Sequence, residues 1–258
     1  MIRTESYSIR MENSLMIFET LEISPVLISV PHDGLPFQAF SGFFETRKIG
    51  YRGRDLYVWP VAKDILVSAT VNAIRGLMPR TLVDYNRAWP EGINYYPLTQ
   101  KEVHTALDDV RLVQEYQHYH ASIDRILDKS IKKFGRGKTL LIDLHGFSKQ
   151  PPYAPEGGYD LILGTGNRIS IPYGNIDEIL AEHMISRGYK VFLPRDTSVG
   201  PVEDYYSADF TTRHHSEKHN INAIQIEIAS RFRKQGAREL GQKLSRDFAE
   251  FIRENYLK

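Results

Sequence analysis

Short apolar runs rich in branched residues recur along the chain and alternate with longer amphipathic segments. Such runs are typical of strands inside an α/β sheet, because these strands are covered on both faces. The pattern predicts strands at 26–30, 81–85, 139–144, 159–164, 190–193 and 223–228. It predicts helices over 55–77, 99–134, 176–187 and 237–256. This alternation favours a three-layer α/β/α fold with a mixed, mostly parallel central sheet.

No feature of the sequence divides the chain into parts. Its 258 residues are 41% hydrophobic, which is enough for a sizeable core. The Pro- and Gly-rich stretch 147–158 is interpreted as a loop, because apolar runs resume directly after it. We therefore expect residues 1–258 to form a single α/β domain.

The charge balance indicates a small-molecule partner. The chain carries 33 Lys and Arg against 32 Asp and Glu, and has no basic block that would attract nucleic acid. Its N-terminus lacks the apolar core of a signal peptide, and no run approaches the ~18 apolar residues of a membrane helix. We expect a cytoplasmic protein that binds neither nucleic acid nor membrane, and the oligomeric state is left open.

The absence of cysteine limits the chemistry. With no cysteine in the chain, disulfides, thiol nucleophiles and iron–sulfur clusters are excluded. Any zinc site must use histidine and carboxylate ligands.

Two histidines stand at the ends of predicted strands. His32 follows the strand 26–30, and His145 follows an apolar run in which Asp143 lies two residues earlier on the same face. Ligands of open α/β sheets bind at this edge, and a carboxylate in the position of Asp143 can orient an imidazole through its second nitrogen. The pattern predicts a His₂-carboxylate metal site with an open position for water.

The third ligand is a carboxylate that the sequence leaves between two candidates. Asp55 stands at the start of the predicted helix 55–77, and Glu45 is its rival. Asp55 also has a simpler interpretation, as an acidic residue favoured by the helix dipole.

Polar residues also follow the predicted strand 81–85. Arg87 can hold a carboxylate in a two-bond fork, with the Asn86 amide adding a hydrogen bond. The alternative is a structural ion pair between Arg87 and a neighbouring carboxylate such as Asp84.

The run 223–228 alternates strictly, so Gln225 and Glu227 share one face of a strand. If that face borders a partly dry cleft, the pKa of Glu227 is raised toward the range of a general base. If it faces solvent, the strand is an ordinary edge strand.

Taken together, these motifs resemble the N-formylglutamate amidohydrolase family. They occur in the family's order and cover roughly residues 26–233. The motifs are Val30-Pro31-His32-Asp33-Gly34, Asp55, Val83-Asp84-Tyr85-Asn86-Arg87, Ile142-Asp143-Leu144-His145-Gly146, Leu163-Gly164-Thr165-Gly166-Asn167 and Gln225-Ile226-Glu227-Ile228. The resemblance implies a fold like that of zinc carboxypeptidases and aspartoacylase, and a zinc-dependent hydrolase of N-acyl amino acids with one zinc per chain.

The resemblance also implies roles for single residues. The expected metal ligands are His32, Asp55 and His145, and Glu227 resembles the carboxylate that activates the attacking water. The expected substrate-binding residues are Asn86, Arg87 and Arg213, with His214 and His215 as further candidates for the pocket. Gly146 departs from the pattern, since family members often have serine there.

Two other functions are compatible with the same residues. A non-catalytic protein could bind a carboxylate ligand on this fold, although pure binding does not need a buried Glu227. A metal-dependent phosphoesterase is expected to use two metals and several bridging carboxylates. The metal content of the purified protein separates the three: one zinc for the amidohydrolase, two metals for the phosphoesterase, none for the binding protein.

Overall fold

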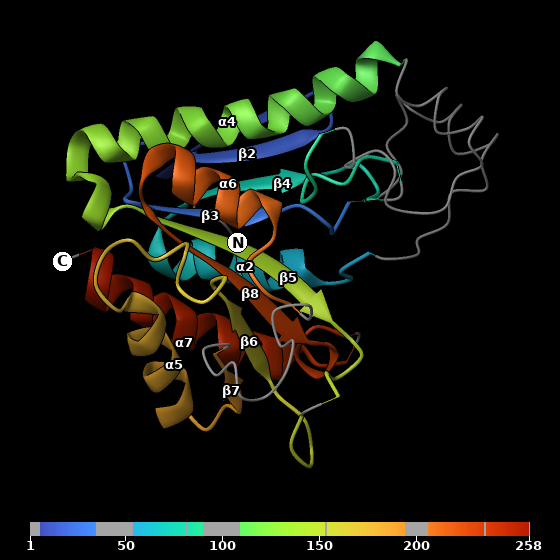
Figure 1. Ribbon diagram of the computed structural model, residues 1–258, viewed down its shortest axis with the longest axis vertical. Helices are drawn as coiled ribbons and strands as arrows, with labels where there is room; N and C mark the ends of the chain where they lie inside the picture. Colours follow the sequence, from blue (N-terminus) through green and yellow to red (C-terminus); the bar gives the residue numbers. More distant parts are fainter. Residues whose placement is uncertain are drawn as a thin grey trace.

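The computed structural model describes residues 6–34, 54–80, 82–89, 109–152, 154–193, 206–234 and 236–257. In this part of the chain an eight-stranded sheet has the order β1-β2-β4-β3-β5-β8-β6-β7 (Figure 1). The strands are β1 (Tyr7–Glu12), β2 (Leu15–Thr20), β3 (Val26–Val30), β4 (Asn72–Gly76), β5 (Leu140–Phe147), β6 (Leu161–Gly164), β7 (Val191–Phe192) and β8 (Asn222–Ala229). The helices are α2 (Val58–Ala69), α4 (Val110–Phe134), α5 (Ile176–Ser186), α6 (Phe210–His219) and α7 (Arg238–Tyr256), with short 3₁₀ turns η4 (Arg136–Lys138) and η7 (Ser230–Phe232).

The parallel strands β3, β5 and β8 form the centre of the sheet. Their registers pair Ser29 with Asp143 and His145 with Glu227. Every residue of β3 and β8 is buried, as expected from their apolar runs. Since the three strands run in the same direction, the polar residues near their carboxyl ends meet at one edge of the sheet.

Helices cover both faces of this sheet, which confirms the predicted α/β class and mixed sheet. On one face α2, α5 and α7 pack against a core that contains Ile28, Ile142 and Ile224. On the other face α4 packs against Leu27 and neighbouring apolar residues, and α6 lies beside α4 (Figure 1). Successive residues of a strand point to opposite faces, so each central strand contributes to both cores.

One predicted element between β3 and α4 is correct only in part, and a second is wrong. The helix predicted over 55–77 ends at Ala69, because Thr70 adopts a left-handed conformation with φ 52°, and the chain continues as β4. Periodicity did not separate the two elements, since a buried helix face and a buried strand are equally apolar. Residues 82–85 form turn and loop instead of a strand, and Thr81 lies outside the described residues.

The hairpin β1–β2 and the helix α6 were not predicted from the sequence. Asn13, with φ 53°, lies in the turn that joins β1 to β2. The predicted helix 99–134 corresponds to α4, which begins at Val110 after the cap residue Asp109; residues 99–108 lie outside the described part of the chain. Within the described residues, no helix is both long and apolar enough to span a membrane.

Candidate active site

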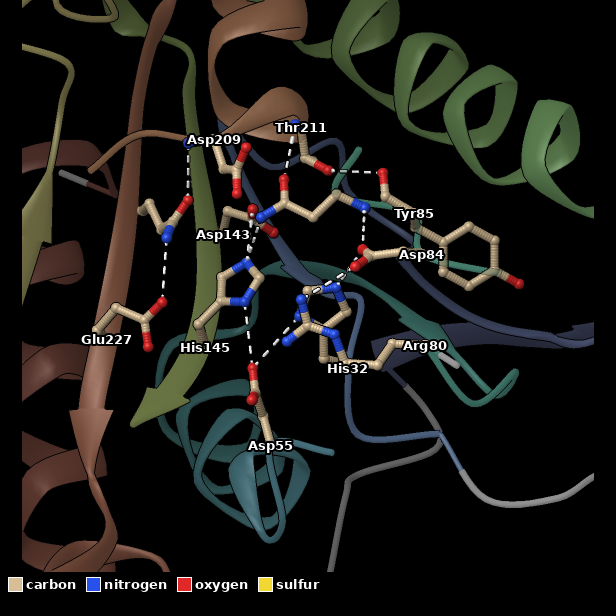
Figure 2. A network of polar contacts seen from close by, with 12 residues as sticks. His32, Asp55, Arg80, Asp84, Tyr85, Asp143, His145, Asp209, Thr211 and Glu227 are labelled. Carbon is tan, nitrogen blue, oxygen red and sulfur yellow. Dashed lines mark hydrogen bonds and ion pairs between the residues drawn. The ribbon is translucent and has the colours of Figure 1, made fainter. Parts of the chain in front are cut away.

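The structure brings His32, Asp55 and His145 together at the carboxyl edge of the sheet. His32 follows β3, His145 lies in β5, and the Asp55 backbone N–H donates to the His32 carbonyl at 3.0 Å shortly before α2 begins. Asp55 Oδ2 lies 3.2 Å from His145 Nδ1 and 3.5 Å from His32 Nδ1 (Figure 2). All three side chains are buried.

The outer nitrogen of each imidazole faces a second carboxylate. His145 Nε2 lies 2.9 Å from Asp143 Oδ2, as the sequence suggested, and Asp143 also accepts a hydrogen bond from the Ser29 hydroxyl at 2.6 Å. His32 Nε2 lies 2.7 Å from Asp84 Oδ1. These contacts hold both rings so that Nδ1 points toward Asp55, which is the arrangement found around metal-bound histidines.

The three inner atoms suit a zinc ion. One ligand atom from each of His32, Asp55 and His145 lies within 4.8 Å of the others. His32 Nδ1 is buried without a hydrogen-bond partner, and a buried polar atom left in this state is costly unless another group satisfies it. Two imidazole nitrogens and one carboxylate form a donor set that zinc prefers. Glu45, the rival third ligand, lies outside the described residues.

The charges of this cluster are strongly coupled. Burial opposes ionisation of His145, but Asp143 and Asp55 outweigh burial and hold the pKa of His145 well above its usual value. Burial acts in the same way against Asp55, yet the two imidazoles hold the pKa of Asp55 well below its ordinary range. The site therefore keeps its carboxylate ionised at any pH near neutrality.

Glu227 projects from β8 into the same region. Its Oε1 accepts a hydrogen bond from Gln225 Nε2 at 3.1 Å, and Gln225 Oε1 accepts from the Asp209 backbone N–H at 2.9 Å. Burial, reinforced by the charge of Asp55, raises the pKa of Glu227 to about 7, although His145 opposes this shift. The strand face therefore borders the site, and Glu227 can exchange a proton near neutral pH.

A cavity of about 620 Å³ opens over these residues. Its lining includes His32, Asp55, His145, Glu227, Gln225, Asn86, Arg87, Arg213 and Arg80. Asn86 is fixed by the Thr211 backbone N–H, which donates to Asn86 Oδ1 at 2.8 Å, and its amide nitrogen lies 3.3 Å from His145 Nε2. Arg213 lines the cavity from α6 with an exposed side chain.

Arg87 has a carboxylate partner that sequence reasoning did not identify. Its guanidinium forms an ion pair with Asp209, the N-cap residue of α6, and donates to the Asn86 carbonyl at 2.9 Å. Asp84, the partner considered from the sequence, instead accepts from Arg80 at 3.0 Å and from His32. No local signal could connect Arg87 with Asp209, because the two are far apart in the chain.

Arg233 is a further residue that the sequence analysis missed. It lies directly after η7, is buried, and packs against Gly146 beside His145. Burial lowers the pKa of Arg233, while the negative charges of Asp55 and Glu227 act in the opposite direction. The only signal in the sequence was Gly146, because a side chain at this position would overlap the Arg233 guanidinium.

His214 and His215 were expected to line the cavity, but neither is among its lining residues. His215 is buried between α6 and α4, where Nδ1 lies 3.1 Å from Asp124 Oδ1 and Nε2 lies 3.0 Å from His120 Nδ1. His219, one turn later, lies 2.7 Å from the same Asp124 oxygen. The sequence of α6 alone could not reveal these contacts, because the partners His120 and Asp124 belong to another helix, α4.

This helix–helix cluster predicts a pH-dependent stability. Burial, followed by the neighbouring imidazoles His215 and His214, holds the pKa of His120 well below 6.5, and burial also lowers the pKa of His215. An imidazole with a lowered folded-state pKa contributes its full stability above about 6.5 and loses it as the pH falls. We expect the contribution of His120 and His215 to the free energy of unfolding to decrease from pH 7.5 to pH 5. The raised pKa values of His145 and Glu227 act in the opposite direction, so the measurement is the difference between wild type and His120→Phe in urea denaturation. Relative to His120→Phe, the wild type should lose stability as the pH falls, and a difference between the two proteins that does not change with pH would contradict the assignment.

Comparison with known proteins places the chain in a family. The family model described as N-formylglutamate amidohydrolase matches residues 24–232. The chain belongs to the N-formylglutamate amidohydrolase family. The match confirms the resemblance drawn from the motifs, and it identifies the protein as an amidohydrolase-family member. The comparison with curated proteins gives no significant match.

Two solved structures share the fold of this family member. N-formylglutamate amidohydrolase from Ralstonia eutropha JMP134 superposes with a TM-score of 0.62 at 18% identity, over 96% of this chain and 99% of that chain. A gene product from Agrobacterium tumefaciens superposes with the same TM-score at 14% identity, over 95% of this chain and 94% of that chain. At these identities the likeness establishes the fold.

Proposed function

We propose that this protein is a zinc-dependent amidohydrolase that cleaves the amide of a small N-acyl amino acid. The observation that carries the proposal is the convergence of His32, Asp55 and His145 in one cavity with the buried carboxylate Glu227. A non-catalytic binding protein has no use for a carboxylate whose pKa is raised to about 7 by burial.

His32 Nδ1, His145 Nδ1 and Asp55 Oδ2 are the atoms that would hold the zinc ion. When bound, zinc supplies Lewis acidity, which makes water more acidic and polarises a carbonyl group. Asp84 and Asp143 hold the two imidazoles in the required orientation through their Nε2 atoms. A single zinc per chain, lost on substitution of these histidines, distinguishes this site from a two-metal phosphoesterase.

Glu227 performs the proton transfer. Because Oε1 is engaged by Gln225, Oε2 is the oxygen that remains to accept a proton from the attacking water. The same carboxyl group then returns the proton to the leaving amine nitrogen. A carboxyl group with a pKa near 7 is suited to both steps, since it gives up a proton about as readily as it takes one.

Asn86 and Arg87 bind the substrate α-carboxylate in this proposal. The ion pair with Asp209 keeps the Arg87 guanidinium in place at the cavity wall before substrate arrives. It also limits selectivity, because Arg87 keeps a charged partner when the substrate is neutral. The cost of an uncharged substrate is therefore one lost charge-assisted hydrogen-bond contact, about 1.5–3 kcal/mol, and not that of an isolated buried charge.

The test of the proposal compares a free acid with its amide. Wild-type kcat/KM should be about 10- to 100-fold higher for an N-acetyl or N-formyl amino acid than for its C-terminal amide. Arg87→Ala should remove this preference, and Arg87→Lys should restore little of it, since an ammonium cannot form the planar fork. Equal rates for acid and amide in the wild type would contradict the assignment of Arg87.

A further inference from the structure

A second cavity adjoins the first and is strongly cationic. It has a volume of about 450 Å³ and shares Asp55, Arg80, Gly146 and Tyr206 with the cavity described above. Its basic lining residues are Arg54, Arg80, Lys149, Arg233 and Lys234. Among the described lining residues Asp55 is the only carboxylate, and it belongs to the candidate metal site.

Arg233 differs from the other arginines of this cavity. Arg54 and Arg80 have carboxylate partners, at 2.7 Å to Asp33 and 3.0 Å to Asp84. In the described part of the chain, Arg233 has no carboxylate within ion-pair distance. Its guanidinium donates to two backbone carbonyls, from Nε to Ile228 at 2.9 Å and from Nη1 to Leu56 at 2.6 Å.

These two hydrogen bonds orient Arg233 and leave one edge of it unused. Nη2 has no hydrogen bond to the described residues, while Arg233 as a whole is only 8% exposed. Carbonyl oxygens satisfy donors but do not neutralise the charge. A buried, fixed guanidinium with a free edge on a cavity is suited to bind an anion in a desolvated contact.

Gly146 makes this position of Arg233 possible. A Cβ atom at residue 146 would overlap Nε and Cζ of the guanidinium, so any side chain there would displace it. Gly146 directly follows His145 and lines both cavities. The glycine and the arginine therefore act as a pair at the junction of the two cavities, next to the candidate metal ligands.

The position of the junction assigns a substrate group to each cavity. In the proposed function, the α-carboxylate lies with Arg87 in the first cavity and the scissile amide lies at the metal ligands. The second cavity then receives the acyl side of the amide. A formyl group would leave most of it empty, whereas a longer acyl group that ends in a carboxylate would reach the cations.

Building on the proposed function, we propose that Arg233 binds a carboxylate on the acyl group of the substrate. The preferred substrates are amino acids acylated by a dicarboxylic acid, of which an N-succinyl amino acid is the simplest probe. The basic residues around Arg233 attract the same anionic group, and Gly146 keeps the guanidinium accessible to it.

The test compares three acyl groups on one amino acid: N-succinyl, N-butyryl and N-formyl. Butyryl matches the chain length of succinyl without its charge. Wild-type kcat/KM should be about 10- to 100-fold higher for succinyl than for butyryl, mainly through KM, as expected for one charge-assisted contact. Arg233→Gln should remove this preference and leave butyryl and formyl hydrolysis within a few fold of wild type.

Two further variants control for folding and for general charge. Gly146→Ser keeps Arg233 but displaces it, and should also lose the succinyl preference. Lys234→Gln removes an exposed cation of the same cavity, and should change the preference less than about threefold. Each variant should unfold at the same temperature as the wild type, which would show that the variant is folded.

Two results would overturn the inference. One is a wild-type enzyme that hydrolyses succinyl and butyryl substrates equally well. The other is an equal loss of kcat for all three acyl groups in Arg233→Gln, which would place Arg233 at the reacting amide. Failure of all three substrates would instead contradict the proposed function. Binding of free succinate by calorimetry then tests Arg233 separately: weaker binding by Arg233→Gln supports the inference, and unchanged binding overturns it.

Discussion

Replacing Glu227 with glutamine is expected to lower kcat by at least about a hundredfold, because general-base catalysis typically contributes 10²–10⁴. Glutamine keeps the size of the side chain and an oxygen that can accept from Gln225, but it cannot take a proton. The bound zinc and the unfolding temperature should stay at wild-type values, since Glu227 is outside the proposed ligand set. The measurement is steady-state kinetics on a confirmed N-acyl amino acid, with zinc content determined in parallel.

Gln225→Glu is not a suitable control for this experiment, because it would add a second buried carboxylate beside Glu227. Glu227→Asp is more informative, since it retains the basicity and shortens the side chain. A partial loss of kcat in Glu227→Asp with a much larger loss in Glu227→Gln would show that catalysis requires the basicity of the carboxylate. Near wild-type activity of Glu227→Gln would eliminate Glu227 as the base.

His145→Ala is expected to lose most of the bound zinc, and with it nearly all activity. Removal of one of three protein ligands leaves two side chains that cannot hold the ion alone. His32→Ala and Asp55→Ala should have the same effect. Zinc content after gel filtration and the zinc concentration needed to restore activity are the measurements.

Asp143→Asn provides a graded comparison for the same site. Asp143 contacts His145 Nε2 and not the proposed metal position, so its loss should weaken zinc affinity by about 10- to 100-fold without abolishing binding. If Asp55→Ala keeps full zinc occupancy while Glu45→Ala abolishes it, the third ligand has been assigned to the wrong carboxylate.

Local sequence was sufficient for the elements that run through the centre of the sheet. The bounds of β3 were predicted without error, and β5 and β8 were predicted within three residues at either end, because each is a short run buried on both faces. Their polar residues were therefore placed correctly at one edge. The same reasoning failed at residues 71–77, where an apolar segment after a helix is indistinguishable from its continuation until its strand partners are known.

For the candidate site, too, the sequence and the tertiary structure provided different information. The sequence by itself indicated His32, His145 and Glu227 as candidates, because each stands in a motif a few residues long, and it left the third ligand open between Asp55 and Glu45. The tertiary structure decided what those residues contact. The partnership of Asp84 with His32 and that of Arg87 with Asp209 join residues 52 and 122 positions apart. The proximity of Arg233 to Gly146 likewise exists only after the sheet has formed. Periodicity and spacing report the local conformation of a chain, whereas these contacts depend on which distant segments pack together.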